Sequence, residues 1–352
     1  MPDRLKIARL PAWLPWFIGR LGYGLLTAWV ISVMVFIATQ ALPSDPARVI
    51  LGPDAPLESV ITLRQQLGLD RPILQQYLSW QAQVLRGDLG ISLDSAQPVA
   101  GMLLDRFGNT LALLLGVLLV VVPLALVVGI GLALRRDSRL DRWGLATLIV
   151  LKATPGFLLA MGLVLLFSMP GFDLLPAVSL IDPDTPLWRQ LQYLLLPIFA
   201  LSLTSLPYLA RLVRASMIET LDSDYVGAAR LRGVPQWRIV WRHTLPNALV
   251  PAVQGVALTL RTLVGGALLA EVIFSFPGIG TLLNSAIQMR DLPLIQGVVL
   301  VITLGVVLVN LLADLLTVLL TPKLRTARRP ALISRSRRGI QSWWRRPAAK
   351  AP

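Results

Sequence analysis

Long apolar runs are the main pattern of this sequence. Each has about the 20 residues that a helix needs to cross a hydrocarbon core of roughly 30 Å. A buried core helix is the alternative for any single run, but several such runs in one chain favour membrane spans. We predict an all-α membrane protein with six transmembrane helices, an even number that leaves both termini on one side. The predicted spans are residues 21–42, 111–134, 142–172, 191–210, 245–270 and 292–320.

The alternative for the first run is a secretory signal peptide. The run is longer than the usual apolar region of such a signal, and no A-x-A cleavage site follows it. We therefore expect a retained helix, preceded by a cytoplasmic segment at 1–20.

Composition supports a membrane protein. The chain has 352 residues, of which 55% are hydrophobic and 15% charged, and its mean hydropathy is +0.67. Soluble domains carry about 25% charged residues. The net charge of +14 suggests nucleic acid or a membrane as partner. The predicted termini and the loops on their side hold 24 of the 33 Lys and Arg residues, and the opposite side holds 7. Basic loops stay in the cytoplasm, so we expect both termini there, a lipid bilayer as partner and no nucleic acid.

Several kinds of chemistry are absent from the sequence. There is no cysteine and a single histidine, His243, so disulfides, thiolate nucleophiles and multi-histidine zinc sites are excluded. We predict no catalytic residue and no metal site. None of the four lysines stands in a G-x-x-x-x-G-K-[ST] loop. The chain is expected to bind no cofactor, so any ATP and Mg²⁺ would be used by partner subunits.

Between the spans, the sequence predicts one larger external segment. Residues 43–108 are expected to be partly helical, because 57–67 and 72–85 show helical spacing of apolar residues, with Gly68 and Pro72 between them. The second external loop, 171–189, is expected to be irregular. The core is predicted at 109–322, and the basic tail at 323–352 is expected to be disordered or to lie along anionic headgroups. No internal repeat is evident.

The cytoplasmic loop at 222–246 has an unusual pattern. Acidic and Ser residues at its start are typical helix N-caps, and Gly233 is suited to end a short helix. Pro235 suits the first turn of a second short helix, and Pro246 is expected to disfavour helix just before span five. Trp237 and Trp241 give the second helix an apolar content that favours a docking surface. The alternative is an amphipathic loop lying on the membrane.

Within this loop, the pattern Gly227-Ala-Ala-x-x-x-Gly, followed after nine residues by His243-x-Leu-Pro, resembles the EAA loop of bacterial ABC importer permeases. Over about residues 17–326 the chain resembles the dipeptide/oligopeptide and nickel permeases of that group. The other matching segments are Leu42-Pro-Ser-Asp-Pro, Leu67-Gly-Leu-Asp, Arg86-Gly-Asp-Leu-Gly, Asn109-Thr-Leu, Leu209-Ala-Arg-Leu-Val-Arg-Ala-Ser-Met, Glu271-Val-Ile-Phe-Ser-Phe-Pro-Gly-Ile-Gly, Arg290-Asp-Leu-Pro and Val309-Asn-Leu-Leu-Ala-Asp-Leu.

The resemblance implies a type I ABC importer permease fold in a bacterial inner membrane, moving peptides or nickel complexes by alternating access. It also implies four partners: a second permease subunit, two cytoplasmic ATPases and an external substrate-binding protein. Carried over, the residues of the ATPase-coupling loop are Tyr225, Gly227, Ala228, Ala229, Gly233, Leu245 and Pro246. Two of its positions depart from the motif, because Gly227 stands where Glu is usual and His243 where Ile is frequent. Tyr225, Arg230 and Arg232 are candidates to replace the missing Glu as anchor.

Charged residues inside the predicted spans are functional candidates, because each costs about 2.5–3.5 kcal/mol at the bilayer centre on insertion scales. Lys152 and Arg261 are candidates to line the pathway and to meet an acidic group of the substrate. The alternatives are snorkelling of Lys152 or an ion pair with Asp314. We interpret Glu271, Asn310 and Asp314 as polar contacts between helices. Gly265 and Gly266 are expected to allow close helix approach.

Two other classes of function remain as alternatives. An ion-gradient-driven secondary transporter would be expected to contain broken half-helices with repeat symmetry, and the sequence indicates none. A membrane-embedded hydrolase would need a base near a Ser within a span, whereas His243 lies on the cytoplasmic loop.

Overall fold

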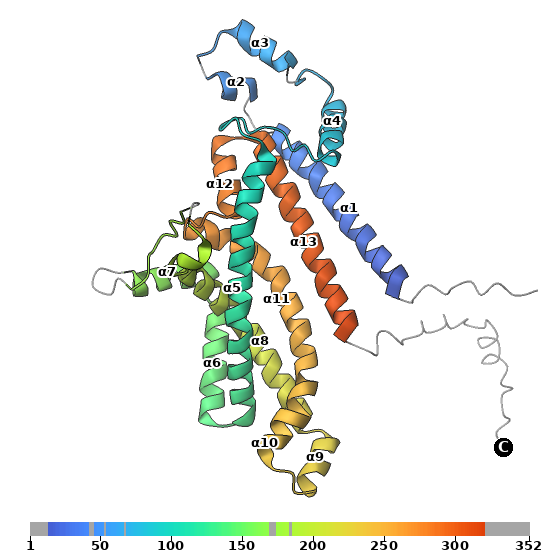
Figure 1. The fold of residues 1–352 in the computed structure, drawn as a ribbon, viewed down its shortest axis with the longest axis vertical. Helices are drawn as coiled ribbons and strands as arrows, with labels where there is room; N and C mark the ends of the chain where they lie inside the picture. Colours follow the sequence, from blue (N-terminus) through green and yellow to red (C-terminus); the bar gives the residue numbers. More distant parts are fainter. Residues whose placement is uncertain are drawn as a thin grey trace, which may run out of the picture.

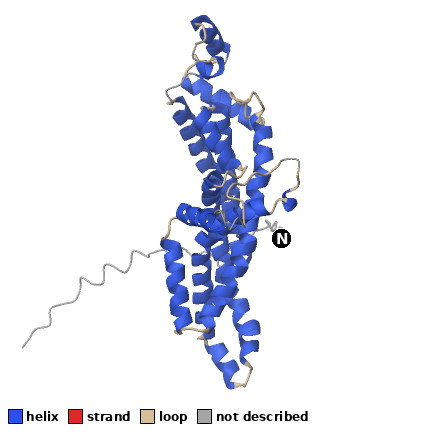
Figure 2. Cartoon of the chain, turned by 90° about the vertical axis from the view of Figure 1, so that its left-hand side faces the viewer, coloured by secondary structure: helices blue, strands red, loops and turns tan. Residues whose placement is uncertain are grey.

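The computed structural model describes residues 13–41, 46–52, 54–66, 68–168, 174–182 and 185–320. These residues form a long, almost entirely helical molecule (Figures 1 and 2). The expected tail at 323–352 and most of the N-terminal segment lie outside the described residues. Among the described residues, an antiparallel bridge between Ile91 and Pro98 is the sole β pairing.

Five helices are long and apolar enough to cross a membrane, and a bent pair of helices makes up to six. The prediction of an all-α membrane protein is therefore confirmed. The five helices are α1 (Trp13–Gln40), α5 (Val99–Leu134), α8 (Gln192–Leu221), α11 (Leu245–Ile273) and α13 (Leu292–Leu320).

The third predicted span is not one helix, and this prediction was wrong. It consists of α6 (Arg139–Ala153) and α7 (Gly156–Phe167), whose axes differ by 106°. The break lies at Thr154 and Pro155. A proline disfavours the helical conformation of the preceding residue, and Thr154 has an extended ψ of 126°. As a result α7 runs across the bundle (Figure 1).

Helix α8 lies at the centre of the bundle. Two-thirds of its apolar window is buried, compared with 17% for α1. On α5, Leu113, Val117 and Val121 are fully buried in the core that includes α8. Their spacing of four residues is that of one helix face. Gly129 brings the two backbones closest, because a Cβ there would lie 2.7 Å from the Ala210 carbonyl oxygen.

The segment that the sequence predicts to be external carries the smaller helices α2 (Pro46–Leu51), α3 (Leu57–Gln66) and α4 (Ile73–Leu85), at the top of Figure 1. The predicted helices at 57–67 and 72–85 are thus confirmed. Helix α4 packs on α1, where Tyr77 hydrogen-bonds to Ser32 at 2.9 Å and contacts Phe36 edge-on. Gln81 donates to both the Ser32 and Tyr77 hydroxyl oxygens.

The boundary expected at residue 108 falls inside a helix. Helix α5 begins at Val99, directly after Pro98, and continues to Leu134 with Pro123 inside it. The base of the external segment is held instead by Asp291, just before α13. Its carboxylate accepts hydrogen bonds from the Ser92 hydroxyl at 2.5 Å and the Leu294 N–H at 3.2 Å.

The second external loop has more order than expected. It contains a 3₁₀ turn at Leu187–Arg189. The buried Gln190 side chain accepts from the Asp182 N–H and donates to the Asp182 and Thr185 carbonyls. Ser179 joins the loop to the bundle through a 2.8 Å bond from its N–H to the Phe274 carbonyl.

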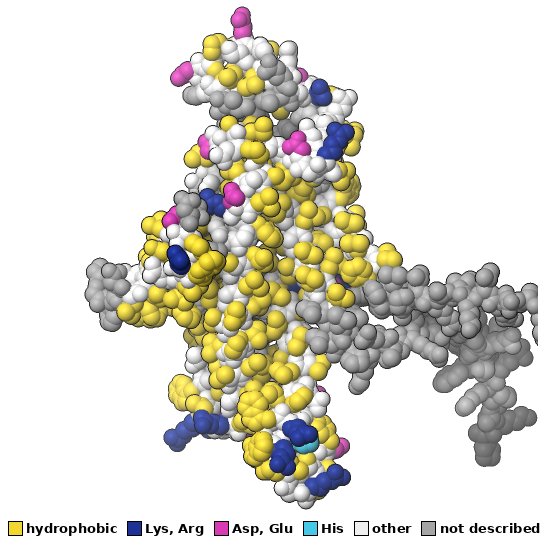
Figure 3. Space-filling model, viewed as in Figure 1, with side chains coloured by type: hydrophobic (Ala, Val, Ile, Leu, Met, Phe, Trp, Pro, Cys, Tyr) yellow, Lys and Arg dark blue, Asp and Glu magenta, His cyan; other side chains and the backbone are white. Residues whose placement is uncertain are grey.

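Charged side chains gather at the two ends of the molecule, with an apolar band between them (Figure 3). Arg, Lys and His side chains dominate the lower end, which carries the α5–α6 turn and the helices after α8. Acidic side chains are concentrated at the opposite end, together with some basic ones. The apolar band is that expected of a multi-pass membrane protein.

The close packing of α5 on α8 predicts different effects for two glycines of one helix. In Gly129→Ala the added Cβ would meet the Ala210 carbonyl and Val213, so we expect a loss of about 1–3 kcal/mol from overpacking. In Gly131→Ala nothing lies within 4 Å, so stability should be unchanged or slightly higher, since Ala favours helix. Thermal unfolding in detergent measures both. Equal melting temperatures would contradict this account of the α5–α8 contact.

Candidate functional site

The loop between α8 and α11 forms a protruding helical tip. It contains α9 (Asp224–Leu231), α10 (Gln236–Arg238) and a π-helical segment (Ile239–Thr244). Gly233 lies between the short helices with φ +76°, a conformation that favours glycine. Leu231 is 91% exposed, and Trp237 and Trp241 are each 63% exposed. These three apolar side chains cover the tip and define what we call the tip surface.

The expected break before span five is absent, and this prediction was wrong. Helix α10, the π-helical segment and α11 form one continuous helix over Gln236–Ile273. The Leu245 N–H donates to the Val240 carbonyl, five residues back. Pro246 has no N–H to donate, so the change from π to α register at this point costs little. A displacement of the tip is therefore passed directly into α11.

The tip is anchored to the bundle at both of its ends. Val226 and Ile239 are fully buried beneath it. The Tyr225 hydroxyl donates to the His243 carbonyl at 3.3 Å and accepts from the Asn247 amide at 2.9 Å. Asp222 pairs with Arg136 of the α5–α6 turn at 2.7 Å.

The remaining coupling-loop candidates lie on this tip or at its end. Ala228 is exposed and Ala229 half-buried on α9, while Leu245 and Pro246 begin α11. A Cβ on Gly227 would meet nothing within 4 Å, so the missing Glu side chain would have had room. Tyr225 makes the anchoring contacts, whereas exposed Arg230 and Arg232 form no ion pair with any residue in the described ranges.

A buried ion pair beside the tip was not anticipated. Arg214 of α8 binds the Asp141 carboxylate through Nε at 2.7 Å and Nη2 at 2.6 Å. Asp141 is 2% exposed and also accepts from the Asp137 N–H. The Ser138 side chain caps α6 by accepting from the Asp141 N–H. The bidentate geometry fixes the first turn of α6 to α8.

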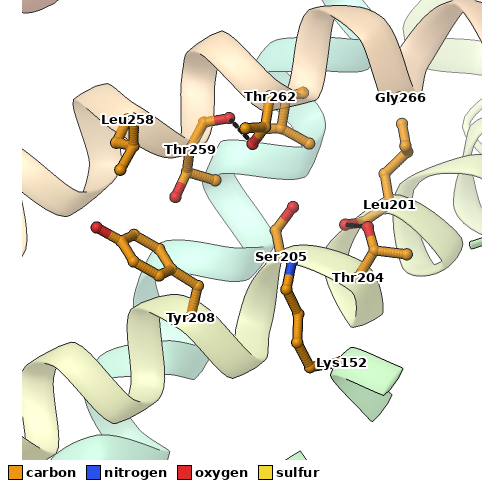
Figure 4. A pocket seen from close by; sticks show the side chains of 10 residues that line it. Lys152, Leu201, Thr204, Ser205, Tyr208, Leu258, Thr259, Thr262 and Gly266 are labelled. Atoms are coloured by element: carbon orange, nitrogen blue, oxygen red, sulfur yellow. Dashed lines mark hydrogen bonds between the residues drawn. The ribbon is translucent and has the colours of Figure 1, made fainter. Parts of the chain in front are cut away.

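Lys152 lies at the other end of α6 and lines a cavity of about 230 Å³. Figure 4 shows its ammonium group directed toward Ser205, among polar side chains of α8 and α11. Thr204, Thr259 and Thr262 donate to carbonyls of their own helices, which leaves acceptor oxygens near the cavity. Lys152 forms no ion pair with the described residues. The polar members of the lining are Lys152, Thr204, Ser205, Tyr208, Thr259 and Thr262.

Arg261 does not share this cavity. It lines a separate one of about 450 Å³ between α1, α11 and α13, with Asp314 and Asn310. Its Nη2 donates to Asp314 Oδ1 at 2.7 Å, and Arg20 Nε lies 3.3 Å from Asp314 Oδ2. On α11, Arg261 points to a different face from Thr259 and Thr262, because successive helical residues are about 100° apart. The two pathway candidates are therefore not brought together.

Glu271 is fully buried at the external end of α11 and contacts two other helices. Its carboxylate accepts from the Thr110 hydroxyl at 2.7 Å and from the Gly280 N–H at 2.5 Å, at the start of α12 (Ile279–Met289). Thr110 in turn accepts from the Ile279 N–H. The start of α12 is a favourable position for a carboxylate. A Cβ on Gly278 or Gly280 would collide with this carboxylate.

Two other sequence-based interpretations have different outcomes. Asn310 is half-buried in the cavity wall and makes no hydrogen bond to the described residues, so its expected helix contact is not observed. Nothing lies within 4 Å of a Cβ on Gly265, whereas on Gly266 it would lie 3.3 Å from Leu201. Close approach thus occurs at Gly266 alone of the two. No group of three potential metal ligands is found among the described residues.

Comparison with known proteins identifies the family. The family model described as the inner membrane component of binding-protein-dependent transport systems matches residues 125–326, and the model of the N-terminal part of such membrane components matches 14–114. The chain belongs to this permease family.

Individual relatives carry more specific names. A protein named as a peptide permease from Brucella suis biovar 1 is 37% identical over 292 residues, which cover 80% of this chain and 89% of the relative. The glutathione transport system permease proteins GsiC of Escherichia coli O6:H1 and Salmonella typhimurium are each 36% identical over 278 residues. These matches cover 79% of this chain and 88% of each relative.

The permease is thus a multi-pass inner-membrane subunit of an ABC importer, and its part in transport is not itself catalytic. The family works with a substrate-binding protein. The resemblance seen in the sequence is confirmed, whereas nickel complexes receive no support from the names of these relatives.

The Glu271 contacts predict a specific loss of stability. Thr110→Val keeps the shape of the side chain, but it removes one of the two hydrogen bonds to the carboxylate and leaves the Ile279 N–H without its acceptor, so we expect a cost of about 1–3 kcal/mol. Thr147→Val is the control, because exposed Thr147 bonds only within α6. Detergent unfolding curves compare the two. An equal effect of both substitutions would contradict the structural importance of this contact.

Proposed function

We propose that this permease moves peptides inward by alternating access, in a complex with a second permease subunit, two cytoplasmic ATPases and an external binding protein. The observation that supports this best is the continuous helix from the exposed tip surface into α11, whose far half lines the Lys152 cavity. Closure of the ATPases would move the tip, and α11 would carry that motion to the cavity. The peptide substrate is inferred from the names of the relatives.

The proposed orientation places both termini and the tip in the cytoplasm. The lower end of the molecule is rich in Arg and Lys, including Arg135, Arg136 and Arg139 at the α5–α6 turn. Basic loops remain on the cytoplasmic side of bacterial membranes. The external segment with α2, α3 and α4 would then face the binding protein.

We propose Lys152 as a pathway residue that meets the carboxylate of a peptide. Its ammonium is directed into a cavity lined by hydroxyl groups, which could hydrogen-bond the same ligand. Lys152 lies one residue before the end of α6, next to the α6–α7 break, and is exposed. The proposal does not extend to Arg261, whose guanidinium already pairs with Asp314 in another cavity.

A secondary transporter is the alternative. The α6–α7 break is a discontinuous helix of the kind that such transporters contain, so the expectation of no broken helix was wrong. The described chain shows a single broken helix, without an inverted counterpart. The apolar tip surface has no function in an ion-coupled carrier and favours an ATP-driven importer.

The tip surface predicts the effect of substitutions on ATPase binding. Trp237→Ser and Leu231→Asp should release a co-purifying ATPase, because buried aromatic anchors of interfaces contribute about 2 kcal/mol or more. Trp188→Ser is the matched control, since Trp188 is 72% exposed at the opposite end. Pull-down from mild detergent measures the ATPase retained. Unchanged retention in both tip variants would refute docking at this surface.

Removing the cavity cation should impair uptake. Lys152→Met is expected to lower peptide uptake about tenfold, the equivalent of ~1.4 kcal/mol, while Lys152→Arg should retain more activity. Uptake into proteoliposomes at saturating binding protein is the measurement, and Arg142→Met, at the exposed start of α6, is the control. If Lys152 meets the peptide carboxylate, the wild type should take up peptides with a free C-terminal carboxylate in preference to C-terminally amidated ones. This preference should be smaller in Lys152→Met. Wild-type uptake by an intact Lys152→Met complex would exclude the pathway role.

A further inference from the structure

The cavity between α1, α11 and α13 has no part in the proposed transport route. Its volume is about 450 Å³, and its polar end holds Arg20, Arg261 and Asp314. Asp314 is the one acidic residue that lines it, and it pairs with both arginines at 2.7 and 3.3 Å. Two guanidinium groups therefore share one carboxylate, and the described lining carries one more positive charge than negative.

Arg261 has unused hydrogen-bonding capacity. Its Nε is buried and has no partner among the described residues, although Nη2 binds Asp314. A guanidinium presents five N–H donors, and an unpaired buried donor costs about 1–3 kcal/mol. An anionic oxygen in the cavity would satisfy this donor and balance the excess charge.

The polar end of the cavity lies near one end of two helices. At 1.5 Å per residue, Arg20 is about 10 Å from the first residue of α1, and Asp314 is about 9 Å from the last residue of α13. Gly24 allows α1 to approach α13 one turn from Arg20, because a Cβ there would lie 2.6 Å from Val307. Arg20 is 52% exposed at its side chain, and a long arginine stem can extend toward the headgroup region.

The rest of the cavity wall is mainly apolar and belongs to transmembrane helices. Ile31 of α1 and Ile302, Val306 and Leu311 of α13 form this part, together with the hydroxyl-bearing Thr27 and Thr303. The lining thus changes from charged to apolar along one cavity, which is the pattern of a phospholipid headgroup and its acyl chain. Basic pockets between transmembrane helices on the cytoplasmic side bind anionic headgroups.

We propose that this cavity binds the phosphate of an anionic phospholipid from the cytoplasmic leaflet, with Arg261 and Arg20 as its donors. The bound lipid joins α1, which is otherwise poorly buried, to α11 and α13. The leaflet follows from the orientation proposed above, whereas the site itself depends only on the cavity and its charges.

The test measures lipid retained by the transporter purified in mild detergent. Native mass spectrometry quantifies phosphatidylglycerol and phosphatidylcholine after exchange into each, and thermal unfolding is followed with each lipid or with inorganic phosphate. We expect several-fold more phosphatidylglycerol than phosphatidylcholine on the wild type. Arg261→Gln should lose this preference, and Arg142→Gln, which removes an exposed charge outside the cavity, should keep it.

A second pair of variants distinguishes loss of the lipid site from a folding defect of Arg261→Gln. Asp314→Asn increases the excess positive charge, so it should retain more phosphatidylglycerol than the wild type. The double variant Arg261→Gln/Asp314→Asn should retain less than Asp314→Asn alone. Equal binding of the two lipids, or equal losses in Arg261→Gln and Arg142→Gln, would overturn the proposal. It would also be overturned if inorganic phosphate alone gave the full stabilisation, or if the Tyr23→Cys side chain crosslinked to another subunit that fills the cavity.

Discussion

A polar group that this chain carries into the apolar bundle is costly unless it finds a partner there, because hydrocarbon offers none. The observed contacts follow from this constraint. Glu271 accepts from Thr110 and from the start of α12, and Asp314 pairs with arginines from α1 and α11. Near the end that carries the tip, Asp141 pairs with Arg214. Each carboxylate therefore joins helices that are distant in sequence, and the apolar surfaces fill the space between these contacts.

The same constraint separates the charges that pair with a carboxylate from one that does not. Arg214 and Arg261 are paired with carboxylates from other helices. Lys152 lies at a cavity lined by hydroxyl-bearing and apolar side chains and has no acidic partner among the described residues. The sequence presents Lys152 and Arg261 as equivalent interruptions of apolar runs. Their different surroundings arise from packing, which brings Asp314 to Arg261 and leaves Lys152 at a cavity.

Much of the fold was predictable from hydrophobic pattern. Apolar runs located the five long helices, and helical spacing located α3 and α4. The α6–α7 break was less evident, although Pro155 was visible in the sequence, because a proline within a span either bends the helix or is accommodated by its neighbours. Pro246 shows the opposite case, since a π-helical segment keeps the helix continuous there. The Asp141–Arg214 pair could not be predicted, because local sequence does not indicate which of several loop charges meet.

The ion pair at the first turn of α6 has a mechanical consequence. Asp141 is held by Arg214, close to the tip, while Lys152 lies on the same rigid helix about 16 Å away at 1.5 Å per residue. Helix α6 is thus held at its first turn, and any tilt of the helix about that turn displaces its opposite end most. A tilt of about 10° around the first turn would move the Lys152 ammonium group by roughly 3 Å, about the length of a hydrogen bond. The position of the cation in its cavity therefore reports the angle of α6.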